Sequence, residues 1–326
     1  MRQSYQLQDG TLLACDDDTA PLQLCIAPDA EERAGLRQHF GLDAHALDSA
    51  LDPDEVSRVE FHPRALFLIW KRPESFSGNA NCTFEVSSFG MLLSEHQLLL
   101  ISSADSLLCG LHPRRDLYQP LDVLMALLLS NIHHYQGHLK VIKLAARELQ
   151  QRFSQTMHNQ HLLQMLGLSE SLIYYINAIQ SNGSVLSRLR DYGERAGFGA
   201  ATIAQLDDLM IENEQCIKQA EIYASVLSGL MDARGNLLNA NMNEMLRKLT
   251  LINVVFLPLN LIAGIGGMSE FSMMTQAIPW WLSYPLFIVS LIGLAGLMLL
   301  GLRRLFGSPQ TGALNIPARR REQTKR

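Results

Sequence analysis

Residues 249–267 decide the fold and read LTLINVVFLPLNLIAGIGG, without a charged side chain. At a rise of about 1.5 Å per residue, a helix of this length crosses a hydrocarbon core about 30 Å thick. A second apolar run, residues 281–302, reads WLSYPLFIVSLIGLAGLMLLGL. Residues 268–280 between the two runs allow only a tight crossing. We therefore predict two transmembrane helices, and the alternative is a buried hairpin in a soluble protein.

Basic residues predict the orientation of these two spans. Arg247 and Lys248 precede the first span, Arg303 and Arg304 follow the second, and the connecting loop has neither Lys nor Arg. By the positive-inside rule, both termini then face the cytoplasm, and we expect the protein in a bacterial inner (cytoplasmic) membrane. Residues 303–326 would form a basic cytoplasmic tail.

Composition argues against several other classes of protein. The net charge of −5 does not suggest a nucleic-acid binder. The five cysteines are scattered and form no CxxC pair, which argues against a disulfide framework and a zinc ribbon. The sequence contains no catalytic motif and no phosphate-binding loop. We therefore expect no enzyme, no ATP hydrolysis and no resident cofactor.

The residues before the first span predict an α+β protein. Short strand-like and helix-like runs fill the first part of the chain and predict a mixed α/β cytoplasmic domain over residues 1–120. The strands are expected at residues 21–27, 64–70, 84–93 and 98–102, and the helices at 31–40 and 44–50.

From Pro120 onward the pattern is almost wholly helical. We expect helices at residues 121–153, 160–180 and 185–196, the last two separated by the turn-like sequence SNGS. No proline interrupts the chain between residue 200 and Pro258, so one helix on the order of 100 Å long is predicted over residues 200–267. The expected parts are a helical segment at 121–199, a stalk at 200–248, a pore-lining span at 249–267, an outer loop at 268–280 and a second span at 281–302.

One face of the first span is polar. Asn253 and Asn260 lie within it, where polar side chains are costly and rarely face lipid. Alternating steps of three and four residues place them on one helical face that continues into the stalk. This face carries Asp232, Asn236, Asn239, Asn243, Leu246, Thr250, Asn253, Leu257, Asn260, Gly264 and Gly267. Several copies around an axis would turn it inward and line an ion path, and the alternative is a helix–helix interface with asparagines setting the register.

Four short motifs occur in order between residues 226 and 269. They read VLSGLMD at 226–232, NEMLRKLT at 243–250, FLPLNLIAGI at 256–265 and GMS at 267–269. In this order they resemble the stalk end, the membrane entry, the pore core and the Gly-Met-Asn signature of the CorA family of divalent-cation transporters. That family includes the ZntB zinc-transporting branch. Upstream of these motifs, the strand-rich domain followed by helices is similar more loosely.

The resemblance implies a funnel-shaped homopentamer in a lipid bilayer. It would pass divalent cations, which are its substrate, driven by their gradient and the membrane potential. Gly267, Met268 and Ser269 would form the selectivity ring, and Asp232 would bind a regulatory cation between subunits. The inner rings would be formed by Asn243, Leu246, Leu249, Asn253, Leu257, Asn260 and Gly264.

Two departures from the family pattern bear on the ion. Ser269 replaces the signature asparagine, and Gly266 stands where an aromatic residue is common. Mg²⁺ holds its waters tightly and needs acceptors that reach them, so the shorter serine slightly favours Zn²⁺, with Mg²⁺, Co²⁺ and Ni²⁺ open. Glu270 would add a compensating ring of carboxylates or is a solvated loop acid. The alternatives are a Mg²⁺ channel of the CorA type and a non-conducting regulatory or structural protein.

A second candidate metal site lies in the helical segment. His134 and His138 are one helical turn apart, a spacing that suits Zn²⁺. His158 and His161 form a looser pair. A third ligand is not evident for either pair, so the alternative is that these are ordinary exposed histidines.

Overall fold

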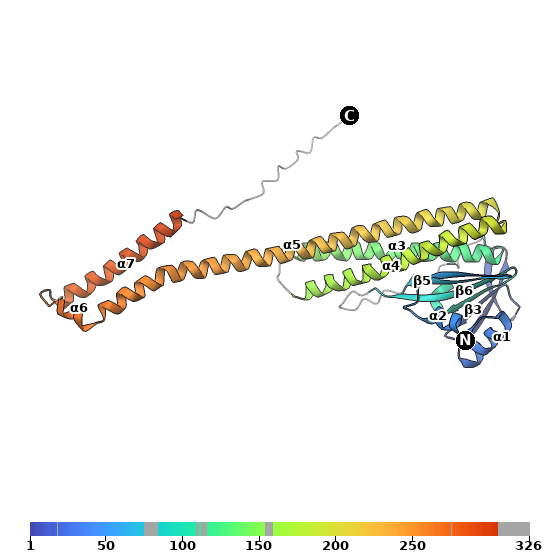
Figure 1. Cartoon of the computed structure of the whole chain (residues 1–326), viewed down its shortest axis with the longest axis horizontal. Coiled ribbons are helices and arrows are strands. Elements are labelled where there is room, and N and C mark those ends of the chain that lie inside the picture. The colour runs from blue at the N-terminus through green and yellow to red at the C-terminus, as the bar shows by residue number, and fades with distance from the viewer. Residues whose placement is uncertain are drawn as a thin grey trace, which may run out of the picture. The chain divides into compact units, whose positions relative to one another are not determined.

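The computed structural model in Figure 1 describes residues 1–17, 19–74, 84–108, 111, 116–153, 159–274 and 276–305. The chain divides into two compact units, Met1–Arg234 and Gly235–Arg326. Helix α5, Ala200–Gly266, is a single helix that belongs to both. The predicted basic tail lies outside the described residues from residue 306 onward.

The first unit is built on a mixed seven-stranded sheet. The strand order is β2-β1-β3-β7-β6-β5-β4, and β3 and β7 are its parallel pair. The strands span Arg2–Gln8 (β1), Thr11–Cys15 (β2), Leu22–Ile26 (β3), Arg58–His62 (β4), Ala65–Pro73 (β5), Val86–Ser94 (β6) and Leu98–Ser102 (β7). The four predicted strands coincide with β3, β5, β6 and β7. Strands β1, β2 and β4 were not predicted, because they are short or carry mainly polar and half-exposed residues.

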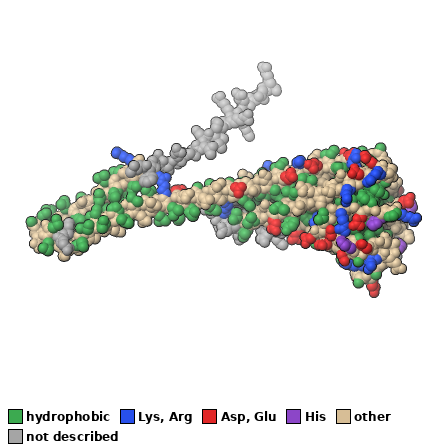
Figure 2. Space-filling view, viewed as in Figure 1, with side chains coloured by type: hydrophobic (Ala, Val, Ile, Leu, Met, Phe, Trp, Pro, Cys, Tyr) green, Lys and Arg blue, Asp and Glu red, His purple; other side chains and the backbone are tan. Residues whose placement is uncertain are grey.

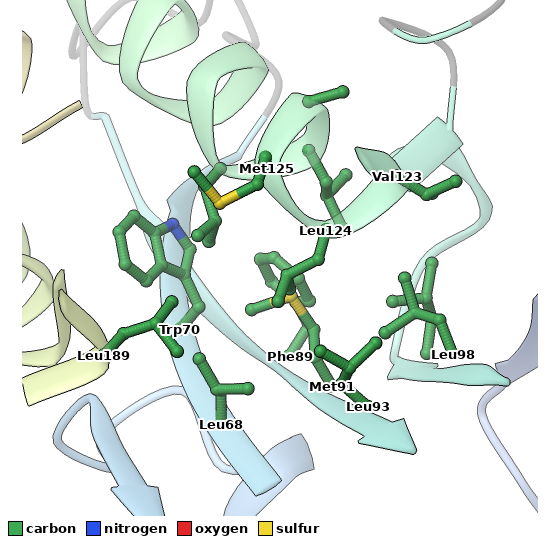
Figure 3. Packing of buried hydrophobic residues seen from close by; sticks show 14 of the residues in the cluster. Leu68, Trp70, Phe89, Met91, Leu93, Leu98, Val123, Leu124, Met125 and Leu189 are labelled. Atoms are coloured by element: carbon green, nitrogen blue, oxygen red, sulfur yellow. The ribbon is translucent and has the colours of Figure 1, made fainter. Parts of the chain in front are cut away.

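Helices cover both faces of this sheet, and the side chains of β5 alternate between the two faces (Figure 1). Leu68 and Trp70 pack toward helices α3 and α4, and Figure 3 shows Trp70 beside Leu189 of α4. Phe67 and Ile69 pack toward helices α1 and α2. This is the period of two that a strand imposes on its side chains. The helices span Ala30–Phe40 (α1), Ala44–Leu51 (α2), Pro120–Phe153 (α3) and Asn159–Ala196 (α4), and Asp105–Leu108 forms a 3₁₀ turn.

Gly90 on β6 allows helix α2 to lie directly on the sheet. A Cβ atom at this position would lie 2.7 Å from the Cβ of Ala50 and 3.4 Å from the ring of Phe67. Carbon atoms in contact are normally about 3.5–4.0 Å apart. Any side chain at residue 90 would therefore push α2 away from the sheet.

Helices α3, α4 and α5 also share an apolar core of their own. Tyr135 of α3 and Tyr175 of α4 are fully buried and meet edge to face, with ring centroids 5.1 Å apart. Cys216 of α5 is buried in the same cluster. Burial raises the pKa of the Cys216 thiol to about 12, so this cysteine is a packing residue and not a reactive thiolate.

Helix α4 is continuous, although the sequence suggests a break around Asn182. The Asn182 side chain is 1% exposed and extends the edge of β5: its Nδ2 donates to the Lys71 carbonyl at 2.8 Å, and its Oδ1 accepts from the Lys71 N–H at 3.0 Å. Oδ1 also accepts from the Ser57 hydroxyl at 2.7 Å. Gly183 makes room for Asn213 of α5, because a Cβ at residue 183 would lie 2.9 Å from its Nδ2. The predicted break is wrong, since these turn-like residues serve tertiary contacts.

The described part of the second unit contains the remainder of α5 and two further helices. Helix α6, Ser269–Met274, lies within the predicted outer loop, and helix α7 spans Trp280–Leu305. In the part of the chain that the structure describes, two stretches are long and apolar enough to cross a membrane, one within α5 and the other Trp281–Leu302. Hydrophobic side chains cover these helices in Figure 2, whereas most charged side chains lie on the first unit.

Candidate functional site

No side of the stalk part of α5 in the second unit is covered by the described residues. Every residue from 235 to 250 is exposed, and the apolar Leu237, Met245 and Leu246 are 60%, 67% and 54% exposed. Large apolar side chains in such numbers on a bare helix indicate a surface that packs against something else. No described residue of the same chain covers them. This part of α5 therefore has the character of an interface between chains.

Within the span, burial divides α5 into two opposite faces. One face is partly covered and consists of Leu251, Val255, Pro258, Leu259, Ile262 and Gly266. At about 100° per residue, this stripe lies on the opposite side of the helix from Asn253 and Asn260, which are both exposed. The polar residues thus occupy the side of α5 that its own chain leaves open.

All the predicted pore positions lie on this open side of α5 or along its edges. Each of them is exposed: Asp232, Asn236, Asn239, Asn243, Leu246, Leu249, Thr250, Asn253, Leu257, Asn260 and Gly264. One continuous helix therefore carries the whole set. Their role in lining a pore stays a prediction, because it requires further copies of the chain.

The charged residues near the membrane entrance lie away from this open face. Glu244 and Lys248 form an ion pair at 2.8 Å, one turn apart on the other side of α5. The hydrogen bond and the charge of Lys248 lower the pKa of Glu244, so this carboxylate stays ionised and paired. On the open face, the Thr250 hydroxyl donates to the Leu246 carbonyl at 2.9 Å. That bond uses the hydroxyl proton and leaves the oxygen lone pairs as acceptors.

The last turn of α5 leads directly into the GMS motif. The Gly267 N–H bonds both the Ala263 and the Gly264 carbonyls at 3.2 Å, and the Met268 N–H bonds the Ile265 carbonyl at 3.1 Å. The bonds to Gly264 and Ile265 span three residues in place of the four of an α-helix, which tightens the end of the helix. Met268 is 55% exposed, and helix α6 starts at the next residue. The predicted motif residue Glu270 lies in this short helix.

Phe287 of α7 is a residue at this site that the sequence did not reveal. A Cβ at Gly266 would lie 2.4 Å from Cζ and 2.7 Å from Cε1 of the Phe287 ring. The ring therefore rests on the backbone of α5, one residue before the GMS motif. The only signal in the sequence was the glycine itself, which replaces an aromatic residue common in the family pattern.

The second candidate site, at His134 and His138, is partly built into the core of the first unit. Their rings meet edge to face at 4.5 Å, and Nδ1 of His138 shares a 2.6 Å hydrogen bond with the Tyr175 hydroxyl. Burial, and then His134, lower the pKa of His138 to about 4, while burial and Arg72 lower the pKa of His134. Both rings are thus neutral at pH 7, the form that binds metal. Among the described residues no third ligand joins them, so the site stays a prediction, and His158 lies outside those residues.

Comparison with known proteins identifies the family. The sequence model described as "CorA-like Mg2+ transporter protein" matches residues 25–304. The "Cobalt/magnesium transport protein CorA" of Methanocaldococcus jannaschii is 27% identical over 261 residues, which cover 75% of this chain and 78% of that protein. The complete structure of the CorA magnesium transporter from the same organism has a TM-score of 0.77 at 21% identity, over 93% of this chain and 98% of that one.

Two further solved structures share the fold. Full-length CmaX has a TM-score of 0.70 at 17% identity, covering 93% of this chain and 97% of that chain. The ZntB cytoplasmic domain from Vibrio parahaemolyticus has a TM-score of 0.57 at 10% identity, covering 74% and 98%. The complete CorA and full-length CmaX structures match the chain over the α/β domain, the long helix and the two apolar helices described above, whereas the ZntB structure is of a cytoplasmic domain. Because the family model spans most of the sequence, this chain belongs to the CorA-like Mg²⁺ transporter family.

Proposed function

We propose that the chain is one subunit of a homopentamer that passes divalent metal cations across a bacterial inner membrane. The path would run along the open face of α5 at the centre of the assembly, with α7 outside it. The observation that carries the proposal is the position of this polar face, opposite the stripe of α5 that its own chain covers. The similarity to the cobalt/magnesium transport protein CorA of Methanocaldococcus jannaschii supports the class of substrate.

The chemistry of the open face suits a hydrated cation. Between Asp232 and the GMS motif it offers amide and hydroxyl oxygens and no charged side chain. Neutral oxygens hold the water shell of an ion without trapping the ion, and rings of Leu246 and Leu257 would gate by excluding water. A membrane potential that is negative inside favours the entry of a cation by about 2.3 kcal/mol per charge per 100 mV.

The choice among divalent ions is proposed to depend on Ser269. A hydroxyl on a short side chain reaches less far toward the waters of Mg²⁺ than an amide does. We favour Zn²⁺ slightly for this reason and keep Mg²⁺, Co²⁺ and Ni²⁺ as substrates to compare. Asp232 would bind a regulatory cation between neighbouring stalks.

The test is a flux measurement with the full chain in liposomes that contain a fluorescent indicator for each ion. Asn243→Leu and Asn260→Leu alter the open face, whereas Asn241→Leu alters the opposite side of the same helix. We expect each of the first two substitutions to slow entry by about tenfold or more, because an apolar ring then replaces a polar one. Asn241→Leu should leave the rate close to wild type.

Two outcomes would contradict the proposal. If an assembled pentamer admits no divalent ion faster than empty liposomes do, the chain is a non-conducting membrane protein. If Asn241→Leu slows entry as much as Asn243→Leu, the open face does not line the path. The mass of the purified assembly, measured in detergent, checks the number of subunits independently.

A further inference from the structure

The contact between Gly266 and Phe287 joins the two apolar helices at one point beside the GMS motif. Three ring atoms of Phe287 lie 2.4 Å, 2.7 Å and 3.2 Å from the place where a Cβ would sit on Gly266. Carbon atoms in contact normally keep about 3.5–4.0 Å apart. Even an alanine at residue 266 would thus require the ring or the helix to move by about 1 Å.

Phe287 belongs to a stripe of α7 that is partly covered while its neighbours are exposed. Ser283, Phe287, Leu291 and Ala295 are half-buried and recur every four residues, as one helical face does. Leu286, next to Phe287, is 68% exposed. On α5, Gly266 is the last member of the corresponding covered stripe. The ring is therefore aimed at α5 and not at lipid.

The position of this contact couples it to the motif. Gly266 is the last residue of α5, and the hydrogen bonds of Gly267 and Met268 to the preceding turn start immediately after it. These bonds tie residues 267 and 268 to the turn that ends at Gly266, so a shift of this turn would move the two residues that precede Ser269, where α6 begins. Gly266 has no side chain that could fix the conformation of this turn, and the Phe287 ring of α7 packs against the turn in its place.

We infer that Phe287 is a positioning residue for the cation-selecting GMS motif, called the mouth below. Phe287 acts on this motif through its contact with the backbone of Gly266. The expected effect of Phe287 on ion selection rests on the proposed function. Its effect on the position of Ser269 does not, because that position can be measured without transport. Gly266 and Phe287 are matched in size. The mouth keeps its geometry only when residue 266 lacks a side chain and the ring at residue 287 fills the space beside it.

The first test compares the Mg²⁺ and Co²⁺ entry rates of the wild type, Phe287→Ala, Gly266→Ala and the double variant in liposomes. We expect Phe287→Ala to change the ratio of the two rates by about threefold or more, within the range of coupling between residues in contact. Gly266→Ala should slow both ions, and the double variant should recover part of that loss. Leu286→Ala, one residue away on the lipid side of α7, is the matched control and should keep the wild-type ratio.

The second test follows Ser269 itself and needs no flux. Ser269→Cys is introduced with and without Phe287→Ala, and a membrane-impermeant maleimide is added outside intact spheroplasts. The same chain without Ser269→Cys measures the background labelling of the native cysteines. All five of these precede the first apolar span and are expected on the cytoplasmic side, out of reach of the reagent. We expect the loss of the ring to change the labelling rate by about threefold or more, whereas Leu286→Ala leaves it unchanged.

The inference is overturned if Phe287→Ala leaves the labelling rate as it is in the control variant. It is also overturned if the effects of the single substitutions on flux simply add in the double variant. A wild type that transports nothing but shows the expected change in labelling would refute the proposed function and retain the positioning role. Phe287→Ala only removes side-chain atoms and introduces no collision, so it is the variant on which the decision rests.

Discussion

Replacing Asn182 by alanine tests how the helical bundle is attached to the sheet. Strand β4 starts at Arg58, which pairs with Ile69, so β5 continues four residues past the end of its neighbour, and Lys71 is the second of these. There the Asn182 amide takes the place of a strand by bonding both the N–H and the carbonyl of Lys71. Alanine removes both bonds, as well as the one from Ser57.

The expected loss follows from the burial of these groups. A polar group left buried without a partner costs about 1–3 kcal/mol. Water reaches some of the freed groups because Lys71 is only partly buried. We therefore expect a loss of about 3 kcal/mol in the free energy of unfolding. In a unit of this size that corresponds to a drop of roughly 6–12 °C in the unfolding temperature.

Thermal unfolding of the full chain in detergent measures this shift, and amide hydrogen exchange at Lys71 locates it. Asn177→Ala is the matched control, because Asn177 lies on an exposed side of the same helix. The reasoning is refuted if Asn182→Ala unfolds within a degree or two of this control. It is equally refuted if exchange at Lys71 stays as slow as in the wild type.

Two further predictions concern the first unit. Gly90→Val should lower the free energy of unfolding by about 1–3 kcal/mol, because the new side chain collides with Ala50. Thermal unfolding measures this loss, and Gly35→Val is the control, because a Cβ at residue 35 meets no atom within 4 Å. His138 has a folded pKa of about 4 against an ordinary 6.5, so the unfolded chain takes up this proton first as the pH falls. Its contribution to stability is therefore complete above pH 6.5 and lost between pH 6.5 and 4. Unfolding temperatures across that range should fall less steeply in His138→Gln than in the wild type, and equal slopes would contradict this.

The sequence predicted the elements whose causes are local. The two apolar spans follow from composition and length, and the strand patterns of β5 and β7 follow from continuous apolar runs that are buried on both faces. Strand β1, RQSYQLQ, was missed because it is polar and half-exposed and is held mainly by its pairing with β2 and β3. Such pairing leaves no periodic signal in the strand itself.

Contacts between distant residues account for the other differences. Asn182 and Gly183 have the composition of a turn, but the partners that keep them in a helix, such as Lys71 and Asn213, lie on other elements. Similarly, the departure from the family pattern at Gly266 could be seen in the sequence, whereas its partner Phe287 could not. Residue types indicated that something unusual occurs at these positions, and only the fold shows what it is.

The parallel pairing of β3 with β7 also affects the order in which the sheet forms. Leu22 pairs with Leu98, 76 residues later in the chain, whereas β4, β5, β6 and β7 join consecutive neighbours. Closing the long loop loses more chain entropy than closing each hairpin, so the β4–β7 meander has the kinetic advantage. The strands β1 to β3 then dock on a template that already exists. Substitutions in β3 should consequently speed unfolding more than they slow folding, since contacts made after the transition state act on the unfolding rate.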